Sequence, residues 1–135
     1  MHKFFEHKAD IGIIGYGTSL EEAFAEGAKA MFEVMVDIKK VKKTKAVKIK
    51  CEASNNEELF VEFLNKLLYE KDVKQMAFCD FHVKIKGNKL TATAYGEKFD
   101  AIKHKVKTEV KAATYSQLKI EKKGNKYYAQ CVVDV

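Results

Sequence analysis

Apolar residues recur at the three- and four-residue spacing of an amphipathic helix in two segments of the chain. The first segment follows Ser19, which stands three residues before Glu22 in the spacing of a capping box. The second follows Asn55 or Asn56, and Asn55 has the same spacing to Glu58, although serine or threonine is the usual first residue of the box. Each segment predicts a helix with one buried face, formed by Leu20, Ala23, Phe24, Gly27, Met31, Met35 and Ile38 in the first and by Leu59, Phe60, Phe63, Leu64, Leu67 and Leu68 in the second.

Elsewhere apolar and polar residues alternate, which is the pattern of a half-buried strand. Gly87-Asn88 and Gly124-Asn125 each separate two such runs by two residues, as in a β-hairpin with a tight turn. The segment 96–116 between the hairpins has no clean period, and long irregular segments in compact domains are often functional. Strands are expected over residues 4–8, 11–16, 47–51, 79–86, 90–94, 118–121 and 127–133.

The order of these elements is two strands, a helix, a strand, a helix and a hairpin, followed by the irregular segment and a last hairpin. Strands outnumber helices and hairpins dominate, which favours the α+β class. We expect a two-layer sandwich in which the two amphipathic helices pack on one face of a mostly antiparallel or mixed sheet. The length of 135 residues suits a single domain over 1–135, with enough chain to bury a substantial core.

Composition gives no sign of a membrane or secreted protein. No apolar run approaches the roughly 20 residues needed to cross a bilayer, and the first residues lack the apolar region of a secretory signal. The cysteines are an odd number without a C-x-x-C pair. Cys51, Cys79 and Cys131 fall at apolar positions of expected strands, so we interpret them as reduced core residues. These features predict a cytoplasmic protein.

The formal net charge of +6 arises from lysine alone among the basic residues, because the chain contains no arginine. Specific recognition of guanine or phosphate usually favours the planar arginine fork. Lysine instead gives a diffuse positive field that steers anionic partners. The simplest interpretation is a solvated surface, and the alternative is direct RNA binding, for which the basic connector 39–43 is a candidate. No DNA or membrane partner is indicated.

Acidic residues stand close to both ends of the chain. Asp10 precedes the glycine-punctuated run 11–17, and the apolar last strand ends on Asp134 and Val135. Such a strand holds the Asp134 side chain and the terminal carboxylate within one residue of each other. If the fold joins the two ends, three anionic groups meet, and they repel one another strongly unless a cation neutralises them. A hard divalent metal ion is the natural partner of such oxygen ligands.

The motifs of a self-contained enzyme are missing from the sequence. It has no P-loop, dinucleotide fingerprint, nucleophile elbow or H-E-x-x-H segment. Gly12, Gly15 and Gly17 have the wrong spacing for a nucleotide cradle and indicate strand irregularity. Lys111 fits either a catalytic lysine or an ion-paired structural lysine. We therefore expect a binding or accessory protein without catalytic activity of its own.

Five motifs in the right order give the chain a resemblance to a known family. From Phe5 to Val135 the sequence resembles archease. No single motif is decisive, but five in succession across the whole chain are specific. The family's H-T-A-D-[IV] corresponds to His7–Ile11, S-L-E-E-A-F to Ser19–Phe24, G-E-x-x-D to Gly96–Asp100 with a matching His104 after it, E-V-K-A-x-T-Y to Glu109–Tyr115, and the closing apolar-Asp-[IV] to Val133–Val135.

The resemblance implies a function that the residues alone do not. It implies an activator of RtcB-type tRNA-splicing ligases, which use GTP and divalent metal to guanylylate an active-site histidine and then join tRNA exon halves. The activator promotes guanylylation and multiple turnover, and it meets RNA only indirectly, through the ligase. A different possibility is a chaperone or adaptor for an RNA-modifying enzyme such as a tRNA methyltransferase.

The resemblance also implies the site. The metal ligands of the family correspond to Asp10, Asp134 and Val135 in this sequence, and the ion is divalent: calcium, magnesium or manganese. Lys8 replaces the family's usual threonine two residues before Asp10, and this change bears on metal affinity. The residues assigned to the functional surface that faces the partner are His7, Lys111, Glu97 and Asp100.

Overall fold

The computed structural model describes the backbone of residues 2–7 and 10–135 and the side chains of residues 2–4 and 10–135. The elements follow one another in the order expected from the sequence, with a short 3-10 helix and a two-residue strand in addition. Their bounds are β1 His2–His7, β2 Asp10–Gly17, α1 Leu20–Met35, η1 Ile38–Lys40, β3 Lys45–Glu52, α2 Asn56–Lys74, β4 Met76–Lys86, β5 Lys89–Lys98, β6 Ala112–Ala113, β7 Lys119–Lys123 and β8 Lys126–Asp134.

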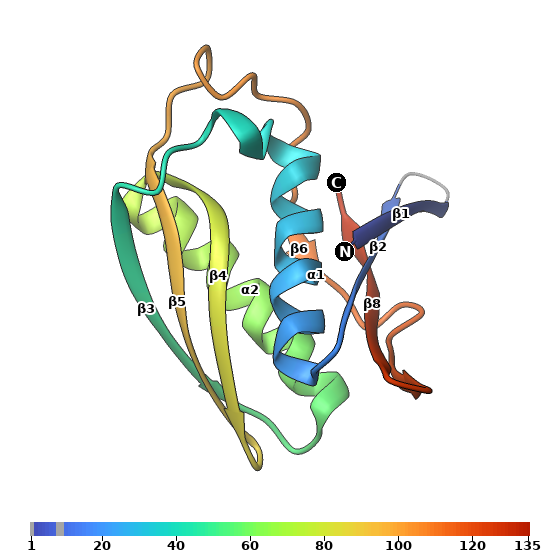
Figure 1. Cartoon of the computed structure of the whole chain (residues 1–135). Coiled ribbons are helices and arrows are strands. Elements are labelled where there is room, and N and C mark those ends of the chain that lie inside the picture. Colours follow the sequence, from blue (N-terminus) through green and yellow to red (C-terminus); the bar gives the residue numbers. More distant parts are fainter. Residues whose placement is uncertain (1, 8–9) are drawn as a thin grey trace.

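The strands form two antiparallel sheets. In the first sheet the order is β1-β2-β8-β6, and β7 also pairs with β8. In the second sheet β5 lies between β3 and β4. Figure 1 shows the second sheet on the left, the first on the right and the helices between them. The α+β class is confirmed. Instead of the expected two layers the fold has three, because α1 and α2 each contact strands of both sheets and form the middle layer.

Side-chain caps begin both helices where the sequence predicts them. Ser19 Oγ accepts a hydrogen bond from the Glu22 N–H at 3.1 Å at the start of α1. Asn55 Oδ1 accepts one from the Glu58 N–H at 2.8 Å at the start of α2, so Asn55 rather than Asn56 is the cap. Each cap satisfies an N–H that the first helical turn leaves without a partner inside the helix.

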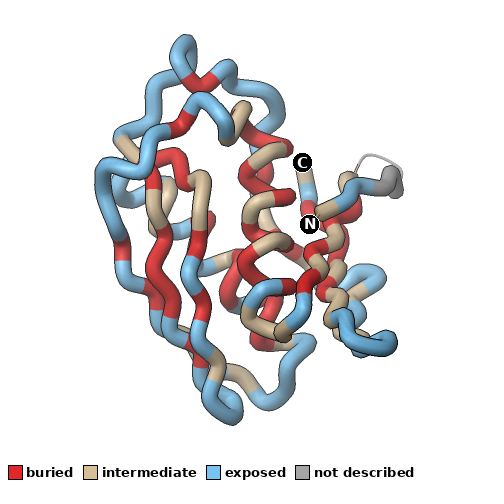
Figure 2. Tube along the Cα trace, in the orientation of Figure 1, coloured by how far each residue is buried: buried red, intermediate tan, exposed pale blue. Residues whose placement is uncertain are grey.

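Aromatic side chains hold the two helices against each other in the core. The ring of Phe24 on α1 lies 5.0 Å from that of Phe60 and 6.2 Å from that of Phe63, both on α2. Burying one such ring stabilises the fold by roughly 1.5–3 kcal/mol relative to leaving it exposed. Figure 2 shows how burial alternates along the strands: in β3, Val47 and Ile49 are buried toward the helices.

A glycine contact sets the approach of β2 to α1. A Cβ on Gly15 would collide with the backbone nitrogen of Gly27 and the carbonyl oxygen of Ala23. A Cβ on Gly27 would in turn lie 2.7 Å from the ring of Phe60. The sequence pattern indicates only strand irregularity at Gly15, whereas the structure gives this residue a packing role, because the strand backbone touches the helix backbone.

Both predicted hairpins are present. Lys86 pairs with Lys89 across the first turn and Lys123 with Lys126 across the second. The turn glycines have φ angles of 62° and 60°, in the left-handed region that glycine adopts without steric cost. The first hairpin joins β4 to β5 and the second joins β7 to β8.

The three cysteines are free thiols. Cys131 is buried, and burial raises the pKa of its thiol to about 12. Burial likewise raises the pKa of Cys51 to about 11. Cys51 and Cys79 are only half-buried, so the predicted core position holds fully for Cys131 alone. These raised pKa values oppose thiolate formation at neutral pH.

In the part of the chain that the structure describes, no helix combines the length and the apolar character needed to cross a membrane.

Candidate functional site

The segments near the two ends of the chain meet on adjacent strands of the first sheet. Ile11 of β2 pairs with Val133 of β8, so Asp10 and Asp134 come next along these antiparallel strands. Asp134 is exposed, whereas Asp10 and Val135 are half-buried. Figure 1 shows the C-terminus at the upper end of β8, the end at which β2 begins. The joining of the ends, on which the metal hypothesis depends, is therefore a property of the fold.

Lys111 lies beside Asp134. Its backbone N–H donates a hydrogen bond to the carbonyl oxygen of Asp134 at 2.8 Å. The next residue, Ala112 of β6, pairs with Asp134 in the sheet. The Lys111 side chain is exposed. Sheet pairing thus gathers at one place residues that are far apart in the sequence.

Carboxylate oxygens define the chemistry of this place. We call it the terminal acidic cluster: the side chains of Asp10 and Asp134 and the α-carboxylate of Val135. Oxygen donors of this kind suit a hard divalent cation. Among the side chains that the structure describes, no group of three or more His, Cys, Asp or Glu residues is placed to hold a metal ion. The cluster therefore reaches three carboxylates only by including the terminal one.

Asn65 anchors the segment that carries Lys111. Its Oδ1 accepts a hydrogen bond from the Ala113 N–H at 2.8 Å, and its Nδ2 donates one to the Ala113 carbonyl oxygen at 3.1 Å. A helix side chain thereby satisfies both backbone groups of a strand residue, as a neighbouring strand would. Sequence reasoning misses Asn65, although an asparagine within the apolar stretch 63–68 is a signal of this kind.

Glu97 accepts three hydrogen bonds at the end of β5. Its Oε2 accepts from the Lys42 backbone N–H and from His104 Nε2, each at 2.9 Å. Its Oε1 accepts from Lys103 Nζ at 2.9 Å. The Lys42 N–H above all, then His104 and Lys103, lower the pKa of Glu97 from its ordinary 4.5 to about 2. Glu97 thus stays ionised and ties the connector after α1 to the irregular segment.

Asp100 and His104 fold the first part of that segment. Asp100 Oδ1 accepts from the N–H groups of Ile102 at 3.1 Å and Lys103 at 3.0 Å, of which the Lys103 N–H contributes most to lowering the Asp100 pKa. His104 is fully buried, and its Nδ1 accepts from the Asp100 N–H at 3.1 Å. A neutral His104 therefore carries its proton on Nε2, which donates it to Glu97.

The structure thus separates the predicted site residues into two groups. Asp10, Asp134, Val135 and Lys111 share one end of the first sheet. Glu97 and Asp100 instead have their partners in the connector and the irregular segment. His7 pairs with Asp10 through the backbone, while its side chain and the whole of Lys8 lie outside the described residues.

The hydrogen bonds of Glu97 predict an acid-sensitive part of the folding stability. A carboxylate whose pKa is lower in the folded state stabilises that state above its ordinary pKa, and this stabilisation is lost as pH falls from about 4.5 to about 2. Glu97→Gln should lower stability at neutral pH and flatten its decline through this window. Urea unfolding midpoints across the window measure both effects.

Glu52→Gln is the matched control, because Glu52 is an exposed carboxylate on β3. It should leave the acid decline of the wild-type protein in place. If the stability of both variants fell with pH as steeply as that of the wild-type protein, the hydrogen bonds of Glu97 would make no special contribution to the acid-sensitive stability.

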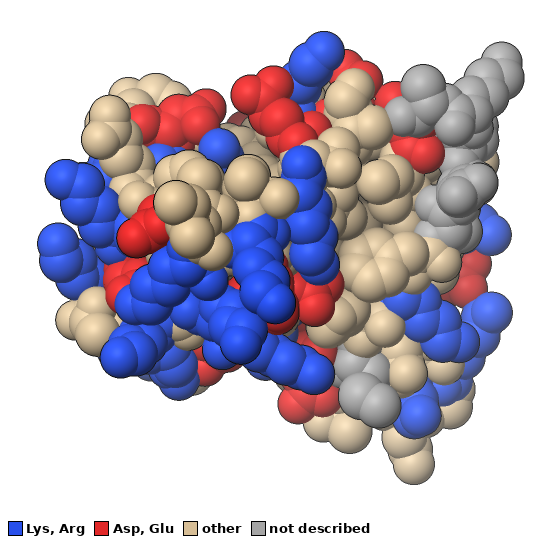
Figure 3. All heavy atoms as spheres, turned by 90° about the horizontal axis from the view of Figure 1, so that it is seen from above, with Lys and Arg blue, Asp and Glu red and all other residues tan. Residues whose placement is uncertain are grey.

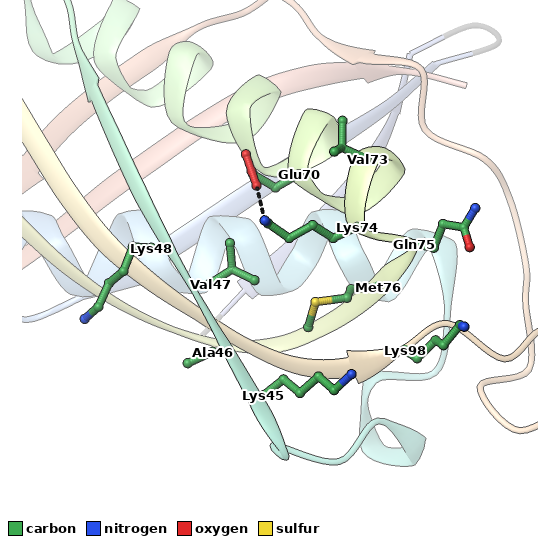
Figure 4. A pocket seen from close by; sticks show the side chains of 10 residues that line it. All are labelled: Lys45, Ala46, Val47, Lys48, Glu70, Val73, Lys74, Gln75, Met76 and Lys98. Atoms are coloured by element: carbon green, nitrogen blue, oxygen red, sulfur yellow. Dashed lines mark ion pairs between the residues drawn. The ribbon is translucent and has the colours of Figure 1, made fainter.

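A hollow of about 670 Å³ lies between the end of α2 and the start of β3. Figure 4 shows Lys74 pairing with Glu70 on the helix side, at 3.7 Å, and Lys45 and Lys98 on the strand side. Its apolar lining includes Val47, Val73 and Met76. The hollow is lined by none of the predicted site residues, so it is separate from the terminal acidic cluster.

Comparison with known proteins decides the family. The sequence profile of the Archease protein family matches residues 2–135. The chain belongs to the archease family. Protein archease of Pyrococcus abyssi is 48% identical to it over 136 residues, covering 97% of this chain and 96% of that protein. Protein archease of Sulfurisphaera tokodaii is 45% identical, covering 98% and 97% of the two chains. The resemblance drawn from the five motifs is confirmed.

Solved structures agree with this archease fold. The solution structure of a Methanobacterium thermoautotrophicum protein, 33% identical in sequence, superposes with a TM-score of 0.87 over 99% of this chain and 98% of that one. The crystal structure of an archease, possible chaperone, from Thermotoga maritima is 27% identical and superposes with a TM-score of 0.64 over 100% and 98%.

Proposed function

We propose that this archease-family protein activates an RtcB-type RNA ligase in tRNA splicing and has no catalytic activity of its own. In this proposal it promotes GTP-dependent guanylylation and multiple turnover of the ligase. One observation carries the proposal: the terminal acidic cluster and Lys111 lie together at one end of the first sheet. Transfer of a nucleotidyl group depends mainly on positioning phosphates and neutralising their charge, and this end offers groups suited to both.

The residues of the cluster have distinct roles in this proposal. Asp10, Asp134 and the Val135 carboxylate hold a divalent ion, which is calcium, magnesium or manganese. When bound, such an ion supplies positive charge to phosphate oxygens. Lys111 adds a second positive charge at the same end of the sheet. This end of the protein docks near the nucleotide site of the ligase.

The fold keeps these groups in a constant relative position. The pairing of β2 with β8 places Asp10 beside Asp134, and β6 holds the Lys111 backbone against Asp134. The two hydrogen bonds of Asn65 attach β6 to α2. Groups held on paired strands need little reorganisation when the partner binds, which favours productive docking.

A multiple-turnover guanylylation and ligation assay with a cognate ligase, at varied GTP and metal, tests the proposal. The double variant Asp10→Asn/Asp134→Asn should lose at least about tenfold in activation, because it removes two charged ligands of the ion. Asp72→Asn is the control, since the Asp72 side chain is 73% exposed on α2, where it pairs with Lys71 at 2.9 Å. It should activate like the wild-type protein.

Calorimetric titration with calcium, magnesium and manganese gives a readout that does not need the ligase. The double variant should bind the preferred ion at least about tenfold more weakly than wild type. Full ligase activation by the double variant would refute the role of the ion. If the wild-type protein left guanylylation and turnover of the ligase unchanged, the proposed function itself would be refuted.

A second candidate function is that of a chaperone or adaptor for an RNA-modifying enzyme such as a tRNA methyltransferase. The description of the Thermotoga maritima relative favours it. So do three exposed apolar side chains in the irregular segment, since Phe99, Ile102 and Val106 are 41%, 91% and 55% exposed. This function predicts that the protein suppresses aggregation of the enzyme, measured by light scattering, without metal or GTP.

A further inference from the structure

The outer face of the β3-β5-β4 sheet carries positive side chains in register. Lys48 of β3 pairs with Thr93 of β5, and Thr93 pairs with His82 of β4. Two further rows follow along the strands, and they are Lys50–Thr91–Lys84 and Glu52–Lys89–Lys86. We call the positive and hydroxyl side chains of these three rows the lysine face.

The helices leave this face to solvent. Residues that alternate with it, such as Val47 and Ile49, are buried toward the helices, and α2 contacts β3. Because neighbouring residues of a strand point to opposite sides, the side chains of the lysine face point away from the core. Lys48, Lys50, Lys84, Lys86 and Lys89 are all exposed.

Carboxylates do not neutralise the lysine face. Within the described residues, none of its five lysines forms an ion pair. Lys48 Nζ donates a hydrogen bond to the Thr93 hydroxyl at 3.0 Å, which positions the ammonium without removing its charge. Glu52, at the rim, is the carboxylate of the three rows.

The other lysine-rich region differs in this respect. The end of the molecule seen in Figure 3 shows many lysines, with carboxylates among them. Lys43 pairs with Asp80, Lys103 with Glu97 at 2.9 Å and Lys107 with Glu33 at 3.8 Å. These three ion pairs neutralise part of the positive charge there, whereas none of the five lysines of the lysine face is paired among the described residues, so the lysine face is the better site for a polyanion.

The geometry of the sheet sets the spacing of the backbone positions that carry these charges. Residues two apart on one strand lie roughly 6.6 Å apart, and neighbouring strands lie about 4.8 Å apart. Two like charges about 7 Å apart in water repel by roughly 0.6 kcal/mol. A chain of phosphates relieves this repulsion and gains entropy by releasing its counterions.

A shallow depression of about 240 Å³ lies on this face. Thr91 and Thr93 contribute to it from the central strand, and Lys48, Lys50 and Lys84 contribute from the strands on either side. Hydroxyl and ammonium groups are suited to phosphate oxygens and to the ribose 2′-hydroxyl. The exposed ring of His82, which also lines the depression, offers a surface on which a base stacks.

We propose that the lysine face binds single-stranded RNA through its phosphodiester backbone. The deep, narrow major groove of an RNA duplex does not admit a three-stranded sheet face, whereas an extended single strand can lie across it. With lysine in place of arginine, the face neutralises phosphates and discriminates little between bases. In the proposed activator function, the protein meets RNA only through the ligase. Direct RNA binding by the lysine face goes beyond that function and does not depend on it.

Fluorescence anisotropy with a labelled single-stranded RNA of mixed sequence, and no ligase present, tests the proposal. With about four phosphates neutralised, the affinity should fall roughly 50-fold between 50 and 200 mM salt. The variant Lys48→Gln/Lys50→Gln/Lys84→Gln should lose at least about tenfold in affinity at low salt. The control Lys39→Gln/Lys40→Gln/Lys42→Gln removes the same charge from the basic connector and should lose much less.

Four results would overturn the proposal. Equal losses in the two triple variants would show that only net charge matters, and the absence of binding by wild type at 50 mM salt would remove the site. Equal binding of single-stranded DNA of the same sequence, or tighter binding of polyglutamate of matched charge, would overturn the assignment to RNA. Circular dichroism and thermal unfolding confirm that each variant is folded, since all six lysines are exposed.

Discussion

Replacing Gly15 with alanine is expected to destabilise the protein by at least about 3 kcal/mol, because the new methyl group meets backbone rather than a movable side chain. Its Cβ would collide with the Gly27 nitrogen and the Ala23 carbonyl oxygen of α1. Only a displacement of β2 from α1 relieves the clash, and β2 pairs with both β1 and β8. Urea unfolding measures the loss of stability, and the soluble yield reports it if the variant does not fold.

Gly124→Ala is the control for this change. A Cβ there has no atom within 4 Å, and the residue has a φ of +60° in the hairpin turn. Only the conformational cost of placing alanine in the left-handed region remains, which is about 1–2 kcal/mol. The packing role of Gly15 would be refuted if both substitutions reduced the free energy of unfolding equally.

Short-range signals in the sequence predict the local structure well. The caps at Ser19 and Asn55 and the hairpin turns at Gly87 and Gly124 all depend on residues within four positions of one another. Such interactions form wherever the rest of the chain goes, so a single sequence contains what is needed to predict them. The identities of the strands follow for the same reason from their alternating pattern.

The sequence does not reveal in the same way which distant strands pair with each other. Alternation shows that a strand has a buried face but not which strand lies beside it, so one sheet and two sheets look alike in sequence. Only the structure therefore shows the pairing of β2 with β8 and the placement of both helices between the sheets. Sequence patterns do not reveal the role of Asn65 for the same reason, since its partner Ala113 lies 48 positions away.

The residues of the candidate site also differ in how far the sequence predicts them. Asp10 and Asp134 are predictable as neighbours because each stands at an end of an apolar strand, provided that the fold joins the two ends of the chain. Glu97 and Asp100 came from the resemblance alone. Their contacts with His104 and Lys103 depend on how the irregular segment folds, and that segment has no period from which to predict it.

Extending the chain beyond Val135 by two glycines should reduce ligase activation by at least about tenfold and should weaken divalent-ion binding by a similar factor. The two side-chain carboxylates of the terminal acidic cluster would remain, but the third would move out of reach. The fold should survive, because the Asp134 carbonyl keeps its bond to the Lys111 N–H and β8 keeps its pairing with β2. Guanylylation assays and calorimetric ion titration measure the two losses.

Val135→Ala is the matched control for the extension, because it keeps the α-carboxylate in place and removes only apolar contact. Val135 packs against the core as a partly buried residue, so this variant should lose some thermal stability while it still binds the ion and activates the ligase. The opposite pattern, with full activation by the extended protein and loss in Val135→Ala, would mean that the Val135 side chain docks on the ligase. The terminal carboxylate would then have no part in activation, and the cluster would be reduced to two aspartates, too few to hold a metal ion without ligands from the partner.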